Sequence, residues 1–242
     1  MEVFWRTIAN YNNATWIYQV ILVIIGVILT ARLITKPGQR TKLAMKIYLI
    51  VLNSWIAIVY YLIYCEERKY NNILALFWGI IACLWIWDTI KGHTTFTRSH
   101  KHDILAYFLI VMPFIYPAIS LARGLSFPSI TSPVMPCSVA VFTIGLLLMF
   151  SENINMYIVL FLGHWSIIAI SKTYFFNIPE DFLLASASVP ALYLFFKEYF
   201  MRDLHKDTKP NSKYITMLLI ILCIIIGSLL TATLFIGLIQ GK

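Results

Sequence analysis

The side chains with the clearest chemical potential are two polar groups that lie deep inside apolar runs. His164 and Asn53 each lie nine residues after the start of a predicted membrane-spanning helix (155–171 and 44–64). At the helical rise, this places both about 13 Å into the bilayer. Polar groups at that depth face the interior of a helix bundle, where they either mark a binding site or hydrogen-bond a neighbouring helix. Both roles are compatible with the sequence.

A second group of side chains lies on what we expect to be the outer face of the membrane. Glu180 and Asp181 open a predicted helix, where carboxylates complement the helix dipole. Arg123 could pair with these acids or receive an anionic ligand. Cys137, near the start of another helix, could be a reactive or metal-binding thiolate, or simply a packed thiol. With His164 and Asn53, these four residues are our candidate binding residues, and no catalytic residue or metal site is predicted.

Other titratable groups gather on the opposite, inner face. Asp88 ends a predicted span beside two tryptophans, which is typical of an interfacial anchor rather than of a proton relay. His100 and His102 precede Asp103 in a pattern that could bind a transition metal, but a third fixed ligand is missing, so an ordinary loop is the alternative. The chain contains no HExxH, GxSxG or phosphate-binding glycine motif, so no motif supports an enzymatic reaction and we predict no cofactor.

The elements that position these groups are predicted to be membrane helices. Of 242 residues, 60% are hydrophobic and 12% charged, with a mean hydropathy of +0.78, too apolar for the surface of a soluble domain. Apolar runs of about 20 residues recur along the chain, which indicates an all-α polytopic membrane helix bundle. The net charge of +8 is spread over loops, as in membrane topology signals, and does not indicate a nucleic-acid partner.

We predict one transmembrane domain, 1–242, with about eight spans. Residues 2–13 read as a short helix in the interface or a lead-in to the first span. A stretch with five prolines, 112–138, should interrupt the helical pattern after the fourth span, and the neighbouring spans should pack around it because its backbone polar groups need partners. The predicted spans are 16–34, 44–64, 72–90, 104–121, 134–150, 155–171, 181–200 and 214–239.

The distribution of basic residues predicts the orientation of these spans. If the loops after the first, third, fifth and seventh spans are cytoplasmic, they and their flanks hold thirteen of the 19 Lys and Arg residues. Cytoplasmic loops of membrane proteins carry such an excess. Both termini are therefore expected outside.

Several pieces of the sequence resemble a bacterial family of multi-pass membrane proteins catalogued as a domain of unknown function. These pieces include Tyr11-Asn12 before Trp16, Pro136-Cys137 followed by Phe142-Thr143-Ile144-Gly145-Leu146-Leu147, and Trp165-Ser166 ahead of Pro179-Glu180-Asp181. The resemblance covers nearly the whole chain. It implies a multi-pass protein of the bacterial cytoplasmic membrane, and it supplies no activity, substrate or catalytic residue. In that family His164 is not a general feature.

Three functions compete on the sequence alone. The first is the binding or passage of a small solute or ion at an outward-facing site within the membrane, below the proline-rich stretch. The second is an accessory or structural membrane subunit with no ligand, whose polar groups all serve helix contacts. The third is an intramembrane enzyme. The expected partners are membrane lipid and a small solute or ion, and the sequence does not determine an oligomeric state.

Overall fold

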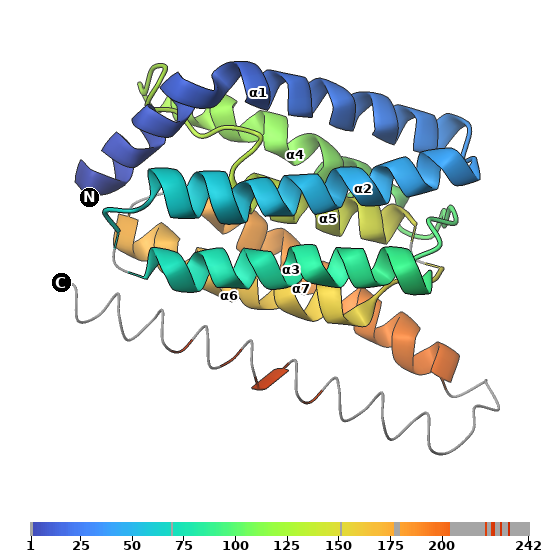
Figure 1. The fold of residues 1–242 in the computed structure, drawn as a ribbon. Coiled ribbons are helices and arrows are strands. Elements are labelled where there is room, and N and C mark those ends of the chain that lie inside the picture. The colour runs from blue at the N-terminus through green and yellow to red at the C-terminus, as the bar shows by residue number, and fades with distance from the viewer. Residues whose placement is uncertain are drawn as a thin grey trace.

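The structure, a computed structural model, describes residues 2–68, 70–150, 152–176 and 180–203, together with positions 221, 224, 225, 228 and 232. The ordered elements in this part of the chain are all helices, and they form an elongated bundle (Figure 1). Their bounds are α1 Glu2–Thr35, α2 Gln39–Trp55, η1 Ile56–Tyr64, α3 Asn71–Lys91, α4 Asp103–Ala122, α5 Pro136–Met149, α6 Met156–Phe176 and α7 Glu180–Asp203.

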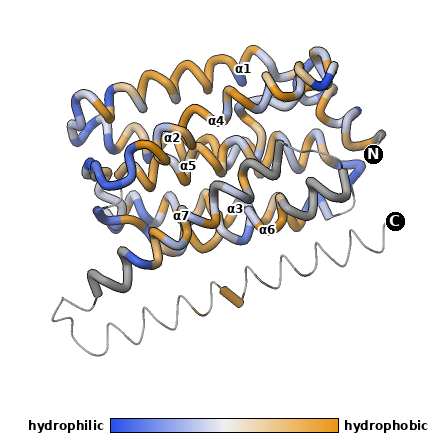
Figure 2. The backbone as a smooth tube through the Cα atoms, turned by 180° about the vertical axis from the view of Figure 1, so that it is seen from behind, coloured by the Kyte–Doolittle hydropathy of each residue, from blue (hydrophilic) through white to orange (hydrophobic). Residues whose placement is uncertain are grey.

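A helix overlaps each of the first seven segments in which the sequence predicts one; the eighth, 214–239, lies largely outside the described residues. Among the described residues, four helices are long and apolar enough to cross a membrane: Val3–Thr35, Gln39–Tyr64, Asn71–Lys91 and Asp103–Ala122. Two further apolar stretches, Pro136–Met149 and Met156–Ala169, are shorter. The hydrophilic residues gather mainly at the ends of the bundle (Figure 2).

The first helix begins much earlier than the predicted span. Residues 2–13 are not a separate interfacial helix but the first turns of α1, and Figure 1 shows α1 bending after this N-terminal part. Two side chains of this part, Tyr11 and Asn12, are buried and hydrogen-bond the proline-rich stretch, and these contacts favour a helix that extends beyond the apolar run. Along the rest of α1, residues such as Ile24 and Ile28 are about half exposed, as expected of a helix facing lipid.

The short helix α5 lies in the centre of the bundle. Of its 14 residues, all but Phe142 are buried. It packs closely on α4: a Cβ added at Gly145 would lie 2.9 Å from the backbone nitrogen of Ile110 and 2.9 Å from Cβ of Leu109. This close approach requires glycine, because any larger residue would push the two backbones apart.

Within the proline-rich stretch, the helix ends later than the positions of the prolines predict. Pro113 and Pro117 lie inside α4, which runs unbroken to Ala122, and Pro136 occupies the first turn of α5 as expected. Only residues 123–135 form the connecting loop, hereafter the proline loop. Tertiary packing of α4 on α5 therefore overrides the helix-breaking effect of two internal prolines.

A feature with no counterpart in the predicted pattern follows α2. Residues Ile56–Tyr64 form a π-helix of 9 residues, in which Cys65 N donates to Tyr60 O at 3.0 Å. Long π-helices are rare and often lie at functional sites. This one places Tyr60 against Tyr11 of α1, with ring centroids 5.0 Å apart at 90°.

Candidate functional site

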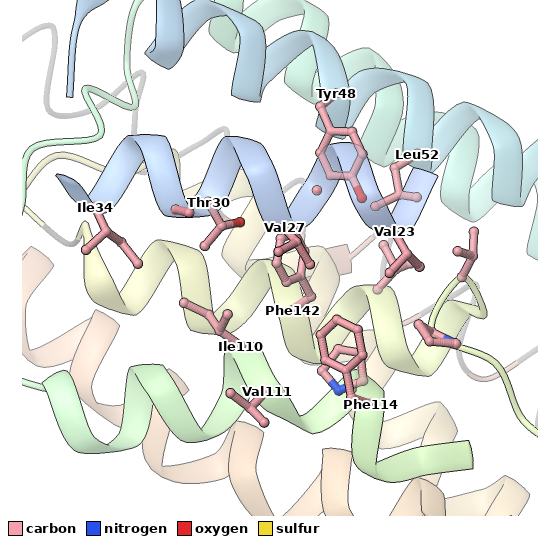
Figure 3. A pocket seen from close by; sticks show the side chains of 16 residues that line it. Val23, Val27, Thr30, Ile34, Tyr48, Leu52, Ile110, Val111, Phe114 and Phe142 are labelled. Carbon is pink, nitrogen blue, oxygen red and sulfur yellow. The ribbon is translucent and has the colours of Figure 1, made fainter. Parts of the chain in front are cut away.

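An apolar hollow lies between α1, α2, α4 and α5 in the described part of the chain. It has a volume of about 280 Å³, close to the lower limit for ligand pockets. In Figure 3, Val23 and Val27 of α1 face Ile110 and Phe114 of α4, and the side chains of α2 and α5 line the rest. We call this hollow the bundle pocket. Its wall is almost entirely apolar, so its occupant must be apolar over most of its length.

The bundle pocket opens sideways, between α1 and α4. The side chains of Val27, Val111 and Phe114 line it and are each about half exposed. Along α1 the lining extends from Val23 to Ile34, about 16 Å at the helical rise. The pocket is therefore an elongated groove along a helix that is apolar enough to cross a membrane, and its mouth faces the surroundings of the bundle.

One polar group in the lining has no partner. The hydroxyl of Thr30 lines the pocket, its residue is only 6% exposed, and Oγ1 has no hydrogen-bond partner among the described residues. A buried hydroxyl left without a partner costs about 1–3 kcal/mol. That cost would be removed by a ligand atom in the pocket that accepts a hydrogen bond from the hydroxyl.

Other hydroxyls on the helices of this chain avoid that cost in a simple way. They donate to the carbonyl oxygen four residues earlier, the usual solution in membrane helices. Three of these hydroxyls lie on α1 itself, so Thr30 departs from the pattern of its own helix. The bonds are Thr7 to Val3 O, Thr15 to Tyr11 O, Thr35 to Ala31 O, Thr89 to Trp85 O, Thr143 to Val139 O and Ser166 to Leu162 O, at 2.6–2.9 Å.

The other polar atom of the pocket is already satisfied. Tyr48 of α2 donates its hydroxyl to Leu22 O of α1 at 3.1 Å. The hydroxyl can reach that carbonyl only because Gly26 has no side chain: a Cβ there would lie 2.4 Å from the Tyr48 oxygen. Tyr48 therefore joins α1 to α2 at one wall of the pocket. Among the described side chains that line the pocket, Thr30 carries the one hydroxyl without a hydrogen-bond partner.

The proline loop beside the pocket is held by polar side chains of α1. The amide of Asn12 donates to Pro128 O at 2.8 Å and to Ile130 O at 2.7 Å. Tyr11 donates to Val134 O at 3.0 Å and in turn accepts from Trp55 Nε1 at 3.0 Å. The expectation that neighbouring helices must satisfy the backbone of this stretch is met by these contacts.

A buried ion pair ties the opposite end of the bundle together. Lys46 Nζ of α2 lies 2.8 Å from Asp88 Oδ2 of α3, and Asp88 is 0% exposed. The other carboxylate oxygen accepts from the backbone and the hydroxyl of Thr94, at 3.0 and 2.9 Å. The same hydroxyl accepts from Asn155 N at 3.1 Å. Asp88 is therefore not an interfacial anchor, as the sequence suggested, but the centre of a buried polar cluster.

The two deep polar residues among our candidates bond mainly within their own helices. Asn53 is 1% exposed and donates to Leu49 O at 2.6 Å, while its Oδ1 has no partner among the described residues. His164 is half-buried, and its Nδ1 lies 2.8 Å from Leu160 O. Its Nε2 lies 3.4 Å from Ser228 Oγ, so this imidazole faces the C-terminal part of the chain. Neither residue lines the bundle pocket.

The four outer candidates lie at one end of the bundle. Arg123 is exposed and follows the last residue of α4, whereas Cys137 is buried in the first turn of α5. Glu180 and Asp181 form the start of α7, and their side chains lie outside the described part. None of the four lines the bundle pocket, so the ligand-binding roles predicted for them remain predictions.

The same end of the bundle carries a shallow polar hollow of about 490 Å³, lined by residues such as Asn10, Tyr64 and Glu66. Arg6 and Glu67 form an exposed ion pair at its rim. Beneath it, Arg68 lies 4.4 Å from the ring centroid of Phe4. Burial alone would lower the pKa of the Arg68 guanidinium, but the Tyr60, Cys65 and Tyr61 side chains raise it more, so its pKa is raised and the group stays charged.

In the segment between α3 and α4, the two histidines of the predicted His-x-His pattern do not converge with Asp103 as metal ligands would. The carboxylate of Asp103 instead pairs with Arg98 at 2.9 Å and lies 3.1 Å from His100 Nδ1. Within the described residues, no group of three His, Cys, Asp or Glu side chains converges as metal ligands would.

Sequence reasoning missed the residues that build the pocket and the ion pair. Val23, Val27 and Phe114 are ordinary apolar residues, and only the tertiary arrangement makes them a wall. Thr30 carried a signal, because it is a lone hydroxyl near the end of an apolar run. Lys46 lay inside a predicted span, where a charge needs a partner, and this too pointed to a buried pair.

A family model with the description "Family of unknown function (DUF6064)" matches residues 1–206 of the chain. No curated protein and no solved structure matches the chain.

Proposed function

Because the chain belongs to the family of unknown function DUF6064, whose description assigns no activity, we propose a function from the geometry of its bundle. We propose that it is an integral membrane protein that binds a hydrophobic constituent of the membrane in the bundle pocket. The observation that carries this proposal is the apolar groove of about 280 Å³ between α1, α2, α4 and α5, open at the side of the bundle. A ligand dissolved in the bilayer reaches such a mouth without crossing water.

This proposal changes the ligand that the sequence suggested, from a solute or ion to an apolar molecule. A polar solute would leave its own hydrogen-bonding groups unpaired against valine, isoleucine and phenylalanine side chains, at a cost of a few kcal/mol each. The pocket offers such a solute only the hydroxyls of Thr30 and Tyr48. A hydrophobic ligand gives up no hydrogen bond when it moves from lipid into this pocket, and it exchanges contacts with lipid for contacts with the apolar wall.

We also propose the membrane arrangement expected from the charge distribution: about eight spans, both termini outside, in a bacterial cytoplasmic membrane. Four helices of sufficient length and apolarity support the membrane setting. Single cysteines introduced into the loops 36–38 and 66–70 test the arrangement with a membrane-impermeant thiol reagent. Labelling of the two loops from opposite sides is expected, and labelling of both from one side would overturn it.

The binding proposal is tested with a tryptophan substitution whose side chain would fill the bundle pocket. Val23 lines the pocket and is half-buried, and Val20 on the same helix is 48% exposed and does not line it. We expect delipidated wild-type protein and Val20→Trp to be stabilised against heat by added membrane phospholipids, and native mass spectrometry to show bound lipid. Val23→Trp should lose both effects. Equal stabilisation and equal lipid retention in Val23→Trp would contradict binding in this pocket.

A structural role without a ligand is the second candidate, and one observation favours it. Among the described residues, the buried charges Lys46 and Asp88 pair with each other, Asp88 also accepts from Thr94, and the Asn12 amide bonds the proline loop. All of these groups find their partners within the bundle and stabilise it. If no lipid stabilises the wild-type protein or either tryptophan variant, this second function is the one to pursue.

A further inference from the structure

The unpaired hydroxyl of Thr30 restricts the ligand class of the bundle pocket. From it we infer that the ligand is a glycerolipid, with one acyl chain in the groove and an ester carbonyl accepting a hydrogen bond from Thr30 Oγ1. This inference rests on the proposed function and deepens it. A pure hydrocarbon would fill the apolar wall equally well but would leave this hydroxyl, on a residue that is 6% exposed, without a partner.

The other threonines of α1 show that the missing hydrogen bond of Thr30 is unusual for this helix. Thr7, Thr15 and Thr35 each donate to the carbonyl four residues earlier, so the helix offers a ready acceptor to any threonine. Thr30 does not use the corresponding carbonyl of Gly26. Its hydroxyl belongs to the pocket lining instead and remains available to an acceptor inside the pocket. A carbonyl oxygen is such an acceptor.

The position of Thr30 along α1 favours a glycerolipid over other carbonyl-bearing lipids. Thr30 lies five residues before the end of α1 at Thr35, about 8 Å at the helical rise. Ester groups of glycerolipids lie at this shallow depth, at the edge of the hydrocarbon core. From Thr30 the lined groove continues to Val23, away from the end of the helix. The acyl chain would take that direction, toward the centre of the bilayer.

The charges beyond the end of the groove fit a phosphate headgroup. Arg32 lies in the last turn of α1, and Lys36 and Arg40 follow in and after the turn to α2; all three are exposed. The phosphate of a glycerolipid lies a few ångströms from its ester groups, closer to the aqueous phase. Basic side chains close to a membrane surface attract anionic lipid. Chain, carbonyl and phosphate thus each meet a matching part of the protein.

The test compares lipids that differ only in the carbonyl. Full-length protein is titrated with a diester phosphatidylglycerol, with the diether analogue that lacks both carbonyls, and with an isoprenoid quinone, and bound ligand is measured by native mass spectrometry. The wild type should bind the diester about three- to tenfold more tightly than the diether, the contribution of one hydrogen bond. Thr30→Val, which keeps the shape, should bind both equally and at the diether level.

Matched variants separate the outcomes. Thr35→Val removes a hydroxyl that is already bonded to Ala31 O and should behave as the wild type, and Thr30→Ser should restore preference for the diester. If Thr30→Val binds the diester as tightly as the wild type does, the inference is wrong. The same holds if the quinone binds and the diester does not. If, with either of these results, Val23→Trp abolishes the lipid or quinone binding seen in the wild type, the proposed function is retained and only the glycerolipid assignment is wrong.

Discussion

Lys46 and Asp88 form an ion pair of 2.8 Å whose carboxylate is completely removed from solvent. Breaking a buried pair by removing one partner costs about 3–5 kcal/mol, because the other charge remains buried alone. We therefore expect Lys46→Met to lower the thermal unfolding midpoint of the detergent-purified protein strongly. Lys91→Met, an exposed lysine on α3, serves as the control and should have little effect.

The double variant Lys46→Met with Asp88→Asn should be more stable than Lys46→Met alone. It leaves no unpaired charge, and the asparagine oxygen can still accept from Thr94. A double-mutant cycle measures the coupling. Additive effects of the two substitutions would show that the pair does not act as a unit.

Asn12→Ala should destabilise the proline loop. The substitution removes both donors to Pro128 O and Ile130 O and leaves part-buried carbonyls without partners, at about 1–3 kcal/mol each. Hydrogen–deuterium exchange should then rise in residues 123–135, together with a lower unfolding midpoint. Asn13 next to it is exposed, so Asn13→Ala should leave both measurements unchanged. Equal exchange in the two variants would refute the role of Asn12.

Gly145→Ala should separate α5 from α4. Its Cβ would meet the backbone of Ile110 and Cβ of Leu109 at 2.9 Å, and backbone cannot move aside as a side chain can. Overpacking of this kind costs about 1–3 kcal/mol. Gly79 of α3 has nothing within 4 Å of an added Cβ, so Gly79→Ala should be neutral or stabilising by up to about 1 kcal/mol. The two unfolding midpoints, measured side by side, decide the matter.

Gly26→Ala should displace the Tyr48 hydroxyl from Leu22 O, since the new Cβ would lie 2.4 Å from that oxygen. We expect a loss of stability of about 1–3 kcal/mol. In a Tyr48→Phe background the same substitution should cost less, because the closest atom is gone. A cycle of the two single variants and the double variant measures this difference by thermal unfolding. An undiminished cost in that background would locate the clash elsewhere.

The positions of seven helices could be predicted because each contains a long apolar run, and the irregular stretch after α4 because proline lacks a backbone donor. Local rules failed where tertiary contacts override them. Pro113 and Pro117 remain helical inside α4, and residues 2–13 continue α1 because Tyr11 and Asn12 bond the proline loop. The π-helix left no trace in the apolar pattern, since its residues are apolar on every side.

The candidate site was much less predictable. Sequence reasoning favours polar residues at membrane depth, and it selected His164 and Asn53, which bond carbonyls of their own helices. A pocket formed by valines and phenylalanines has no compositional signal, because the same residues face lipid elsewhere on α1. Thr30 is the exception. Its importance depends on a missing hydrogen bond, which only three-dimensional coordinates reveal.

The hold of Asn12 on the proline loop also fixes an order of events during biosynthesis. Asn12 and its acceptor Ile130 are 118 residues apart, so α1 leaves the ribosome long before the carbonyls it will bond exist. During that interval the N–H groups of the Asn12 amide must rely on water or lipid headgroups, because Gln19 donates to the Asn12 oxygen, at 3.2 Å, and does not serve those N–H groups. The N-terminal part of α1 can therefore dock on the proline loop only after the loop has been made, and a bulky tag fused ahead of α1 would burden this step.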